Sequence, residues 1–179
     1  NGIGKKGVIM LVSSLSKKCS ETLTYLDFSH NKPGLMDEGS QALGAFLAQA
    51  NKLRTLKMKN CGVNAGLITG GIVRGCNELN SLDLSDNETT SKTNFKGLKT
   101  FFGSSSQLEH VCLGGMHLTT GVMRDLLKSL LVNSSATNLT IDISGNPIGV
   151  IGGNMLGQTL STRNLAFGLN KLDVSNCML

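Results

Sequence analysis

Aromatic residues are scarce in this 179-residue chain, which has no tryptophan, one tyrosine and six phenylalanines. A protein that binds single-stranded nucleic acid stacks bases on several aromatic side chains, so this scarcity argues against such a site. The net charge of +5 comes from basic residues that are scattered rather than clustered, which also argues against a nucleic-acid footprint. We therefore expect no nucleic-acid partner.

Long apolar runs and metal-ligand spacings are also missing. No apolar run reaches the roughly 18 residues needed to span a membrane, and no signal-peptide pattern opens the sequence. The five cysteines are widely spaced, and no Cys-x-x-Cys or His-x-x-x-His pair occurs. This pattern is typical of reduced, buried thiols in a cytosolic protein. We expect no direct membrane insertion, no metal and no cofactor.

Proline is rare, at two residues, whereas glycine is abundant, at 22. Glycines that recur beside asparagine indicate tight turns at regular intervals. The sequence does contain an internal repeat, because six segments follow the pattern L-x-x-L-x-L-x-x-N/C, some with a substitution. The last residue of the pattern, termed the ladder position, is Asn31, Cys61, Asn87, Met116, Asn146 and Cys177, at spacings of 26 to 31 residues.

Each repeat predicts one strand and one helix. The L-x-L part has period two, which is typical of a short strand with one buried face. The ladder residue is expected to turn inward, where an Asn side chain bonds open backbone groups and Cys substitutes for it. Between strands the apolar period becomes helical, as in Leu43, Phe46, Leu47 and Ala50.

One such unit cannot bury its apolar face alone, so the repeats are expected to stack. We predict an α/β leucine-rich repeat solenoid (a horseshoe) of about six repeats, of the ribonuclease-inhibitor-like class. The parallel sheet is expected on the concave face and the helices on the convex face. The chain begins without methionine and ends just after the sixth strand. We therefore expect residues 1–179 to be one repeat domain without terminal caps, from a longer protein, and to form an end-to-end dimer through the open ends.

Candidate partner-binding residues occupy the outward strand positions, because partners usually dock on the concave face of a solenoid. They are Tyr25, Asp27, Thr55, Lys57, Lys59, Asp83, His110, Cys112, Asp142, Lys171 and Asp173. The aspartates recur in an L-D-x-S-x-N pattern, so they either hydrogen-bond along the sheet as part of the scaffold or form an acidic stripe for a partner. Lys57 and Lys59 depart from that pattern. They either pair with neighbouring aspartates, which contributes little energy at a surface, or meet an acidic partner.

His110 and Cys112 lie two residues apart on one predicted strand and therefore share a face. A Cys–His nucleophile also needs an orienting carboxylate and an oxyanion donor, and neither is identifiable in the sequence. No pair of carboxylates with a pocket behind it is identifiable either. We expect the protein not to be an enzyme.

Three stretches of the sequence carry a resemblance to a known family. They are Cys61–Val63 followed by Ile72–Cys76, then Phe95–Ser106, and then Leu139–Asn146 with a one-residue irregularity in its strand. In this order they resemble the CARMIL family, which links actin capping protein and myosin-I. The resemblance covers nearly the whole chain and is strongest from about residue 60 to residue 179.

This resemblance implies a large cytoplasmic scaffold protein of the actin cytoskeleton, at the cell cortex near the plasma membrane. In that family a lipid-binding pleckstrin-like domain precedes the repeats, and a flexible tail with the capping-protein motif and proline-rich segments follows them. Two prolines cannot make an SH3 ligand, so neither myosin-I binding nor capping-protein regulation is carried over to a residue of this chain. We expect a non-enzymatic protein-interaction scaffold with cortical actin regulators as partners.

The alternative is a leucine-rich repeat regulatory module of another class. A GTPase-activating module needs an exposed catalytic arginine near a loop tip. Arg54 follows the first leucine of a strand. The other arginines fall in or near predicted helices, at Arg74, Arg124 and Arg163. A ribonuclease-inhibitor-like module is expected to have a strongly acidic concave face, which Lys57 and Lys59 oppose. A pathogen-sensing repeat domain would depend on neighbouring domains that these residues do not include.

Overall fold

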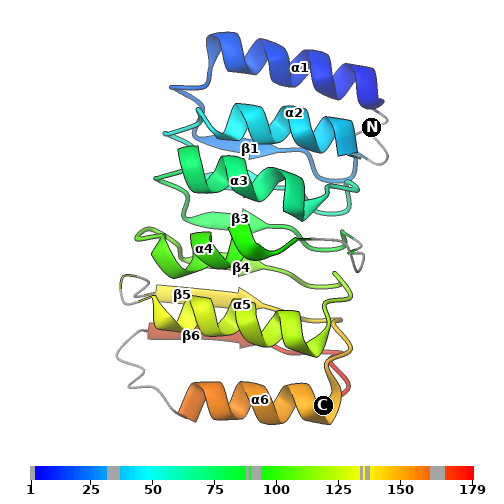
Figure 1. The fold of residues 1–179 in the computed structure, drawn as a ribbon, viewed down its shortest axis with the longest axis vertical. Helices are drawn as coiled ribbons and strands as arrows, with labels where there is room; N and C mark the ends of the chain where they lie inside the picture. Colours follow the sequence, from blue (N-terminus) through cyan, green and yellow to red (C-terminus); the bar gives the residue numbers. More distant parts are fainter. Residues whose placement is uncertain are drawn as a thin grey trace.

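The computed structural model describes residues 3–31, 37–87, 89, 94–133, 135, 138–161 and 168–179, with the backbone alone at 131 and 132. Strands and helices alternate along these ranges (Figure 1). The strands are β1 (Tyr25–Asp27), β2 (Thr55–Lys57), β3 (Ser81–Asp83), β4 (His110–Cys112), β5 (Asn138–Asp142) and β6 (Gly168–Asp173). The helices are α1 (Lys5–Lys18), α2 (Asp37–Leu47), α3 (Ala65–Gly75), α4 (Lys96–Ser104), α5 (Thr120–Val132) and α6 (Gly149–Ser161). None of the helices in the described ranges combines the length and apolar character that a membrane crossing requires.

The six strands form one parallel sheet in chain order, from β1 to β6. Their central apolar residues stand side by side across the sheet and pack against the core, at Leu26, Leu56, Leu82, Val111, Ile141 and Leu172. The register shifts between Leu139 and Thr140 where β5 pairs with β6. This irregularity lies in the fifth repeat, where the sequence departs from the repeat pattern.

The helices cover one face of the sheet and leave the other face open (Figure 1). The predicted stripe Leu43, Phe46 and Leu47 of α2 is buried, and a corresponding stripe of α5 is buried too. Parallel strands lie about 4.8 Å apart whereas packed helices need about 8–10 Å, so stacking bends the two layers towards the sheet. The predicted α/β leucine-rich repeat solenoid, with its sheet inside and its helices outside, is confirmed.

The ladder residue Asn87 joins two consecutive repeats. Its fully buried side-chain nitrogen donates to the carbonyl oxygens of Met58, at 2.6 Å, and Leu84, at 2.9 Å. Its side-chain oxygen accepts from the backbone N–H groups of Cys61, at 3.2 Å, and Val63, at 3.1 Å. One amide therefore satisfies backbone groups in its own repeat and in the repeat before it.

Asn146 makes equivalent bonds to the fourth and fifth repeats. At two other ladder positions a thiol replaces the amide, and the thiols of Cys61 and Cys177 donate to the carbonyl oxygens of Met58 and Ile143. Both cysteines are buried, so they have the structural role that the repeat pattern predicts.

The residue just before each ladder position has a left-handed backbone, with φ between +48° and +66°. These residues form what we term the αL column, which consists of His30, Asn60, Asp86, Gly115, Gly145 and Asn176. Gly, Asn, Asp and His tolerate this conformation best, so the residue types fit the geometry. The backbone N–H of His30 donates to Lys59 O at 2.8 Å and that of Asn60 to Ser85 O at 3.0 Å. The column thus extends the hydrogen bonding of the sheet beyond the strands.

Candidate protein-interaction face

The open face of the sheet, termed the strand face, presents three rows of side chains. The strand register places the first row at Tyr25, Thr55, Ser81, His110, Thr140 and Lys171. The second row consists of Asp27, Lys57, Asp83, Cys112, Asp142 and Asp173. The third row lies two residues further along the chain, where the strands lead into turns, at Ser29, Lys59, Ser85, Gly114, Ser144 and Ser175.

The structure brings all of the predicted partner-binding residues together in these rows. The first row holds Tyr25, Thr55, His110 and Lys171, the third row holds Lys59, and the others lie in the second row. Ser81 and Thr140 complete the first row and are not among the predicted residues. Because they follow the repeat pattern without a departure, only their position before the central apolar residue identifies them. The partner-binding role of the face stays a prediction.

The aspartates of the second row close the turn of their own repeat. Asp27 Oδ1 accepts the backbone N–H of Ser29 at 2.8 Å. Asp83, Asp142 and Asp173 accept the equivalent N–H groups at 2.9, 2.9 and 3.0 Å. These bonds support the scaffold interpretation of the aspartates. They run within each repeat, which corrects the expectation of aspartate bonds along the sheet.

Strand β2 lacks this aspartate and has Lys57 in its place. In four other repeats an aspartate at this position accepts the N–H two residues later. In this repeat that N–H belongs to Lys59, and it donates to Ser29 Oγ of the preceding repeat at 3.2 Å. Because the neighbouring repeat supplies the acceptor, the turn after β2 is satisfied without an aspartate. The second-row residue of β2, Lys57, is therefore not needed to close the turn of its repeat.

Lys57 lies beside the one tyrosine of the chain. Its Nζ atom is 5.7 Å from the centroid of the Tyr25 ring, within the range of a cation–π interaction. The Tyr25 hydroxyl donates to Asp27 Oδ2 at 3.2 Å, while half of the Tyr25 side chain stays exposed, at 50%. Tyr25, Asp27 and Lys57 are termed the Tyr25 cluster, which combines an aromatic ring, a carboxylate and a cation on two adjacent strands.

The electrostatics of Asp27 reflect these contacts. Burial alone would raise the pKa of Asp27. The hydrogen bonds from Ser29 and Tyr25 and the charge of Lys57 outweigh burial, so the pKa of Asp27 lies below its usual value of 3.8. Asp27 is therefore ionised at neutral pH and can hold the Tyr25 hydroxyl as a charged acceptor.

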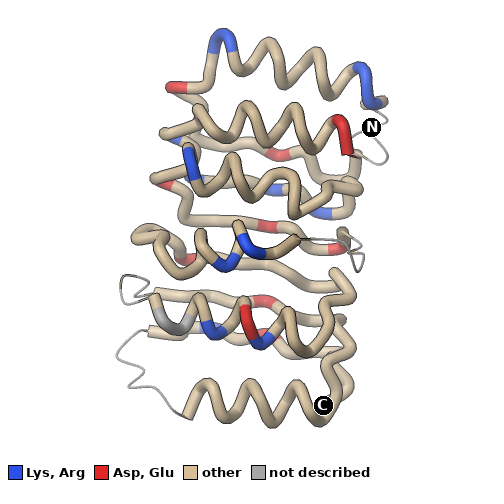
Figure 2. Tube along the Cα trace, in the orientation of Figure 1, with Lys and Arg blue, Asp and Glu red and all other residues tan. Residues whose placement is uncertain are grey.

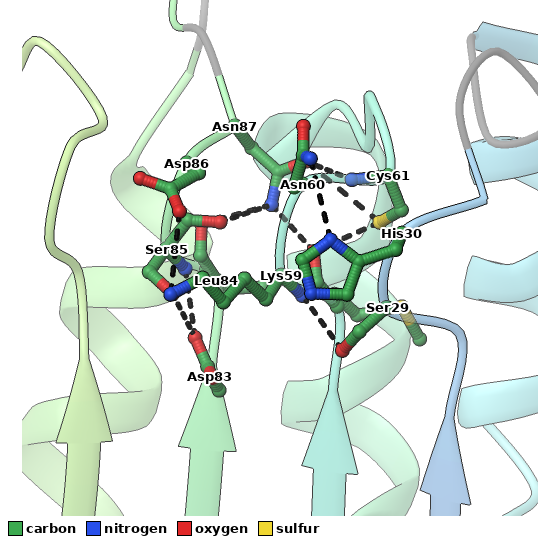
Figure 3. A network of polar contacts seen from close by, with 11 residues as sticks. Ser29, His30, Lys59, Asn60, Cys61, Asp83, Leu84, Ser85, Asp86 and Asn87 are labelled. Atoms are coloured by element: carbon green, nitrogen blue, oxygen red, sulfur yellow. Dashed lines mark hydrogen bonds and ion pairs between the residues drawn. The ribbon is translucent and has the colours of Figure 1, made fainter.

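The two lysines of the second repeat have different environments. Lys59 Nζ lies 3.4 Å from Asp86 Oδ2, and both side chains are about half exposed, so the pair contributes little stability. Figure 3 shows this end of the strands, where Lys59 lies among Ser29, His30 and Asn60 in a network of polar contacts. Lys59 therefore pairs with an aspartate, as one of the two interpretations predicts. The partner is Asp86 of the αL column rather than an aspartate of the second row. Lys57 makes no ion pair with a carboxylate of the described residues.

Cys112 lacks the properties of a nucleophile. Burial, together with the negative charges of Asp83 and Asp142, raises the pKa of its thiol to about 11. A thiol with this pKa is protonated at neutral pH, whereas the thiolate is the reactive form. Across the residues that the structure describes, no group of three potential metal ligands occurs.

The three arginines in the described part of the chain do not form the loop-tip site of a GTPase-activating module. Arg54 Nη2 pairs with Glu78 Oε2 at 3.1 Å, Arg74 lies within α3 and Arg124 lies within α5. Arg163 lies outside the described residues. The strand face mixes lysines with aspartates, so it also lacks the uniform acidity expected of a ribonuclease-inhibitor-like module.

No protein-family profile matches the chain, but several curated proteins do. Protein CARMIL of Dictyostelium discoideum is 36% identical over 158 residues, which cover 88% of this chain and 15% of that protein. The capping protein, Arp2/3 and myosin-I linker proteins 3 of Rattus norvegicus and Homo sapiens are each 31% identical over 145 residues, which cover 79% of this chain and 11% of those proteins.

Among solved structures, the tropomodulin C-terminal domain of Caenorhabditis elegans matches with a TM-score of 0.53 at 15% identity, over 94% of this chain and 82% of that chain. This likeness shows the fold alone. The chain spans 15% or less of the length of these curated relatives, and they match most of its own residues. By these matches, the chain belongs to the CARMIL family.

Proposed function

We propose that this chain is a non-enzymatic leucine-rich repeat module that binds a protein partner of the actin cytoskeleton through the Tyr25 cluster. The names of the relatives describe links to capping protein, Arp2/3 and myosin-I, which supports an actin-regulatory role. Residues 1–179 form one repeat domain of a larger scaffold protein in this proposal. Its place of action is the cytoplasmic actin network at the cell cortex, near the plasma membrane.

The observation that carries this proposal is that Lys57 closes no turn of the scaffold and lies beside the half-exposed Tyr25. Tyrosine is enriched at the energetic centres of protein interfaces, because its ring buries much area and its hydroxyl keeps a polar contact. Strand β4 also lacks the second-row aspartate, but Cys112 offers a protonated thiol in its place. The Tyr25 cluster is therefore the part of the strand face best suited to anchor a partner.

The charges around Lys57 define the kind of partner. Lys57 stands between Asp27 and Asp83 in the second row. A uniformly acidic partner would meet both aspartates and be repelled. The cluster fits a partner that presents one carboxylate to Lys57, an apolar side chain to the Tyr25 ring and basic groups to the aspartates on either side.

A pull-down from cytosolic lysate, quantified by mass spectrometry, tests the proposal. The baits are the unmodified chain, Tyr25→Ala, Lys57→Glu and Lys171→Glu, and the last variant reverses a charge of the strand face far from the cluster. We expect cortical actin regulators to be captured by the unmodified chain and by Lys171→Glu, and to be lost from the other two baits. Equal capture by all four baits, with unchanged thermal unfolding, would show that the cluster is not the binding surface.

We also propose the end-to-end self-association expected from the sequence. Large apolar side chains are exposed on the first and last helices, at Met10, Leu11, Val150 and Ile151. Sedimentation velocity should show a concentration-dependent dimer that Val150→Glu/Ile151→Glu abolishes. A monomer at every concentration would contradict this association.

A further inference from the structure

The helix face and the strand face differ in their balance of charge. Helices α3, α4 and α5 carry one acidic residue, Asp125, and several basic residues, which are Arg74, Lys96, Lys99, Arg124 and Lys128. The three rows of the strand face carry four aspartates and three lysines. Figure 2 shows basic positions along these helices, with aspartates on the strands behind them. Positive charge is therefore in excess on the side formed by α3, α4 and α5.

Asp125 neutralises only part of this charge. Its two oxygens already contact Lys99 Nζ and Arg124 Nε, each at 3.1 Å. Arg74 and Lys96 form no ion pair with a carboxylate in the described part of the chain. Among the described residues, these two cations of adjacent helices therefore have no negative partner.

These two cations line one groove between α3 and α4, with a volume of about 360 Å³. Its lining includes Gly66, Gly70, Val73, Arg74, Lys96 and Thr100. Val73 is 37% exposed and supplies an apolar patch within the groove. A second hollow of about 400 Å³ lies between α4 and α5, but Lys99 and Asp125 in its lining pair with each other. Lys96 lines both hollows, but of the two only the α3–α4 groove is lined by two cations, Arg74 and Lys96, that have no carboxylate partner among the described residues.

Packing does not explain the glycine at position 70. A Cβ atom at Gly71 would lie 2.0 Å from the carbonyl oxygen of Gly44, and one at Gly75 would lie 2.1 Å from that of Leu47, so α2 and α3 need both glycines for their close approach. A Cβ at Gly70 would meet only Arg74 Nη1, at 3.5 Å. The absence of a side chain at Gly70 instead leaves the groove open and lets the Arg74 guanidinium lie back over the helix.

We infer that the α3–α4 groove is a second docking site, separate from the Tyr25 cluster, for an acidic peptide segment of a protein partner. Carboxylates of the segment pair with Arg74 and Lys96, and the planar guanidinium of Arg74 suits bidentate recognition of a carboxylate. An apolar side chain of the segment lies on Val73, in the space that Gly70 leaves. A peptide fits better than a lipid surface, because the cations flank a hollow and interfacial membrane binding relies on apolar side chains that project outward.

Selection of random peptides displayed on phage, with the intact chain as target, tests this inference. The selected peptides should be enriched in Asp and Glu relative to the starting library. Their affinity, measured by fluorescence anisotropy, should fall about tenfold or more for Arg74→Glu/Lys96→Glu and for Gly70→Leu, and should fall with rising salt. Gly70→Leu changes no charge, so its effect reports the volume of the groove and the position of the Arg74 guanidinium rather than the net charge.

Two controls make the outcome decisive. Lys17→Glu/Lys18→Glu makes the same change in net charge on α1, and Tyr25→Ala removes the ring of the strand face. Both should bind the selected peptides as the unmodified chain does. The inference is overturned if acidic residues are not enriched, if the groove variants bind unchanged, or if the α1 variant loses as much affinity as they do. Binding of phosphatidylserine vesicles through Arg74 and Lys96, without peptide binding there, would assign the groove to a lipid surface instead.

Discussion

Lys57 Nζ lies 5.7 Å from the centre of the Tyr25 ring, while the hydroxyl of that ring donates to Asp27 Oδ2. The parallel register causes this arrangement, because it places Thr55 beside Tyr25 and Lys57 beside Asp27. The cation approaches the ring and the carboxylate from the neighbouring strand. An exposed aromatic side chain is thereby held in one orientation by two charged neighbours.

The Tyr25 cluster predicts a specific change in the titration of Asp27. Both Lys57→Met and Tyr25→Phe should raise the pKa of Asp27, because each removes a contact that favours the ionised carboxylate. Carboxyl chemical shifts followed by NMR across acidic pH measure this pKa. An unchanged Asp27 titration in Lys57→Met would show that the two charges do not interact in solution.

The same shift predicts how stability depends on pH. The pKa of Asp27 is lower in the folded protein than its usual 3.8, so its contribution to stability is present above about pH 4 and is lost as the pH falls through the folded-state value. Urea unfolding at a series of acidic pH values should show that Asp27→Asn loses less stability on acidification than the unmodified protein. Parallel losses in the two proteins would contradict the lowered pKa.

Alanine at the ladder position is predicted to be more destabilising at Asn87 than at Asn31. Asn87→Ala removes bonds to both repeats and leaves buried N–H and C=O groups open, so it should destabilise the fold by about 3 kcal/mol. The side chain of Asn31 donates two hydrogen bonds within its own repeat, to the carbonyl oxygens of Phe28 and Ser29, and Asn31→Ala should cost about 1 kcal/mol. Urea denaturation measures both values.

Asn87→Cys extends this comparison, since the repeat itself places cysteine at Cys61 and Cys177. The thiol can donate to a carbonyl as those residues do, so the loss should be smaller than that of Asn87→Ala. A loss as large as that of the alanine variant would show that cysteine does not substitute for asparagine at this ladder position.

Two adjacent glycines of α3 should respond oppositely to alanine. Gly71→Ala would place a Cβ 2.0 Å from the carbonyl oxygen of Gly44, which should destabilise the protein by about 1–3 kcal/mol. Gly70→Ala meets no such obstacle and should stabilise α3 by about 0.5–1 kcal/mol. Thermal unfolding of the two variants checks the pair, and a similar effect of both substitutions would be inconsistent with the observed packing of α2 on α3.

The fold could be predicted from the sequence because each position of the repeat has its own physical requirement. Period-two leucines need a buried strand face, and Asn87 and Cys61 need an inward turn with backbone groups to bond. The residue types just before the ladder positions also indicate a left-handed backbone, although these positions are not part of the repeat pattern. His30, Asn60 and Asp86 stand before ladder positions, and these residue types tolerate positive φ.

The difference between Lys57 and Lys59 could not be predicted from the same pattern. Both are lysines of one repeat, two residues apart, and their roles depend on atoms of other repeats. Ser29 Oγ satisfies the turn after β2 from one side, and Asp86 pairs with Lys59 from the other. Gly70 and Gly71 pose a similar problem, because successive residues of a helix point about 100° apart and only the packing decides which of them meets α2.

Site-specific photo-crosslinking in cytosolic lysate tests the central claim most directly. A benzophenone amino acid placed at Thr55, which neighbours Tyr25 in the first row, should capture a protein of the actin machinery. The same probe at Lys171, in the last strand, should not capture it, and adding Lys57→Glu to the Thr55 probe should abolish the product. A product of equal yield from Lys171, or one that Lys57→Glu leaves unchanged, would contradict binding through the Tyr25 cluster.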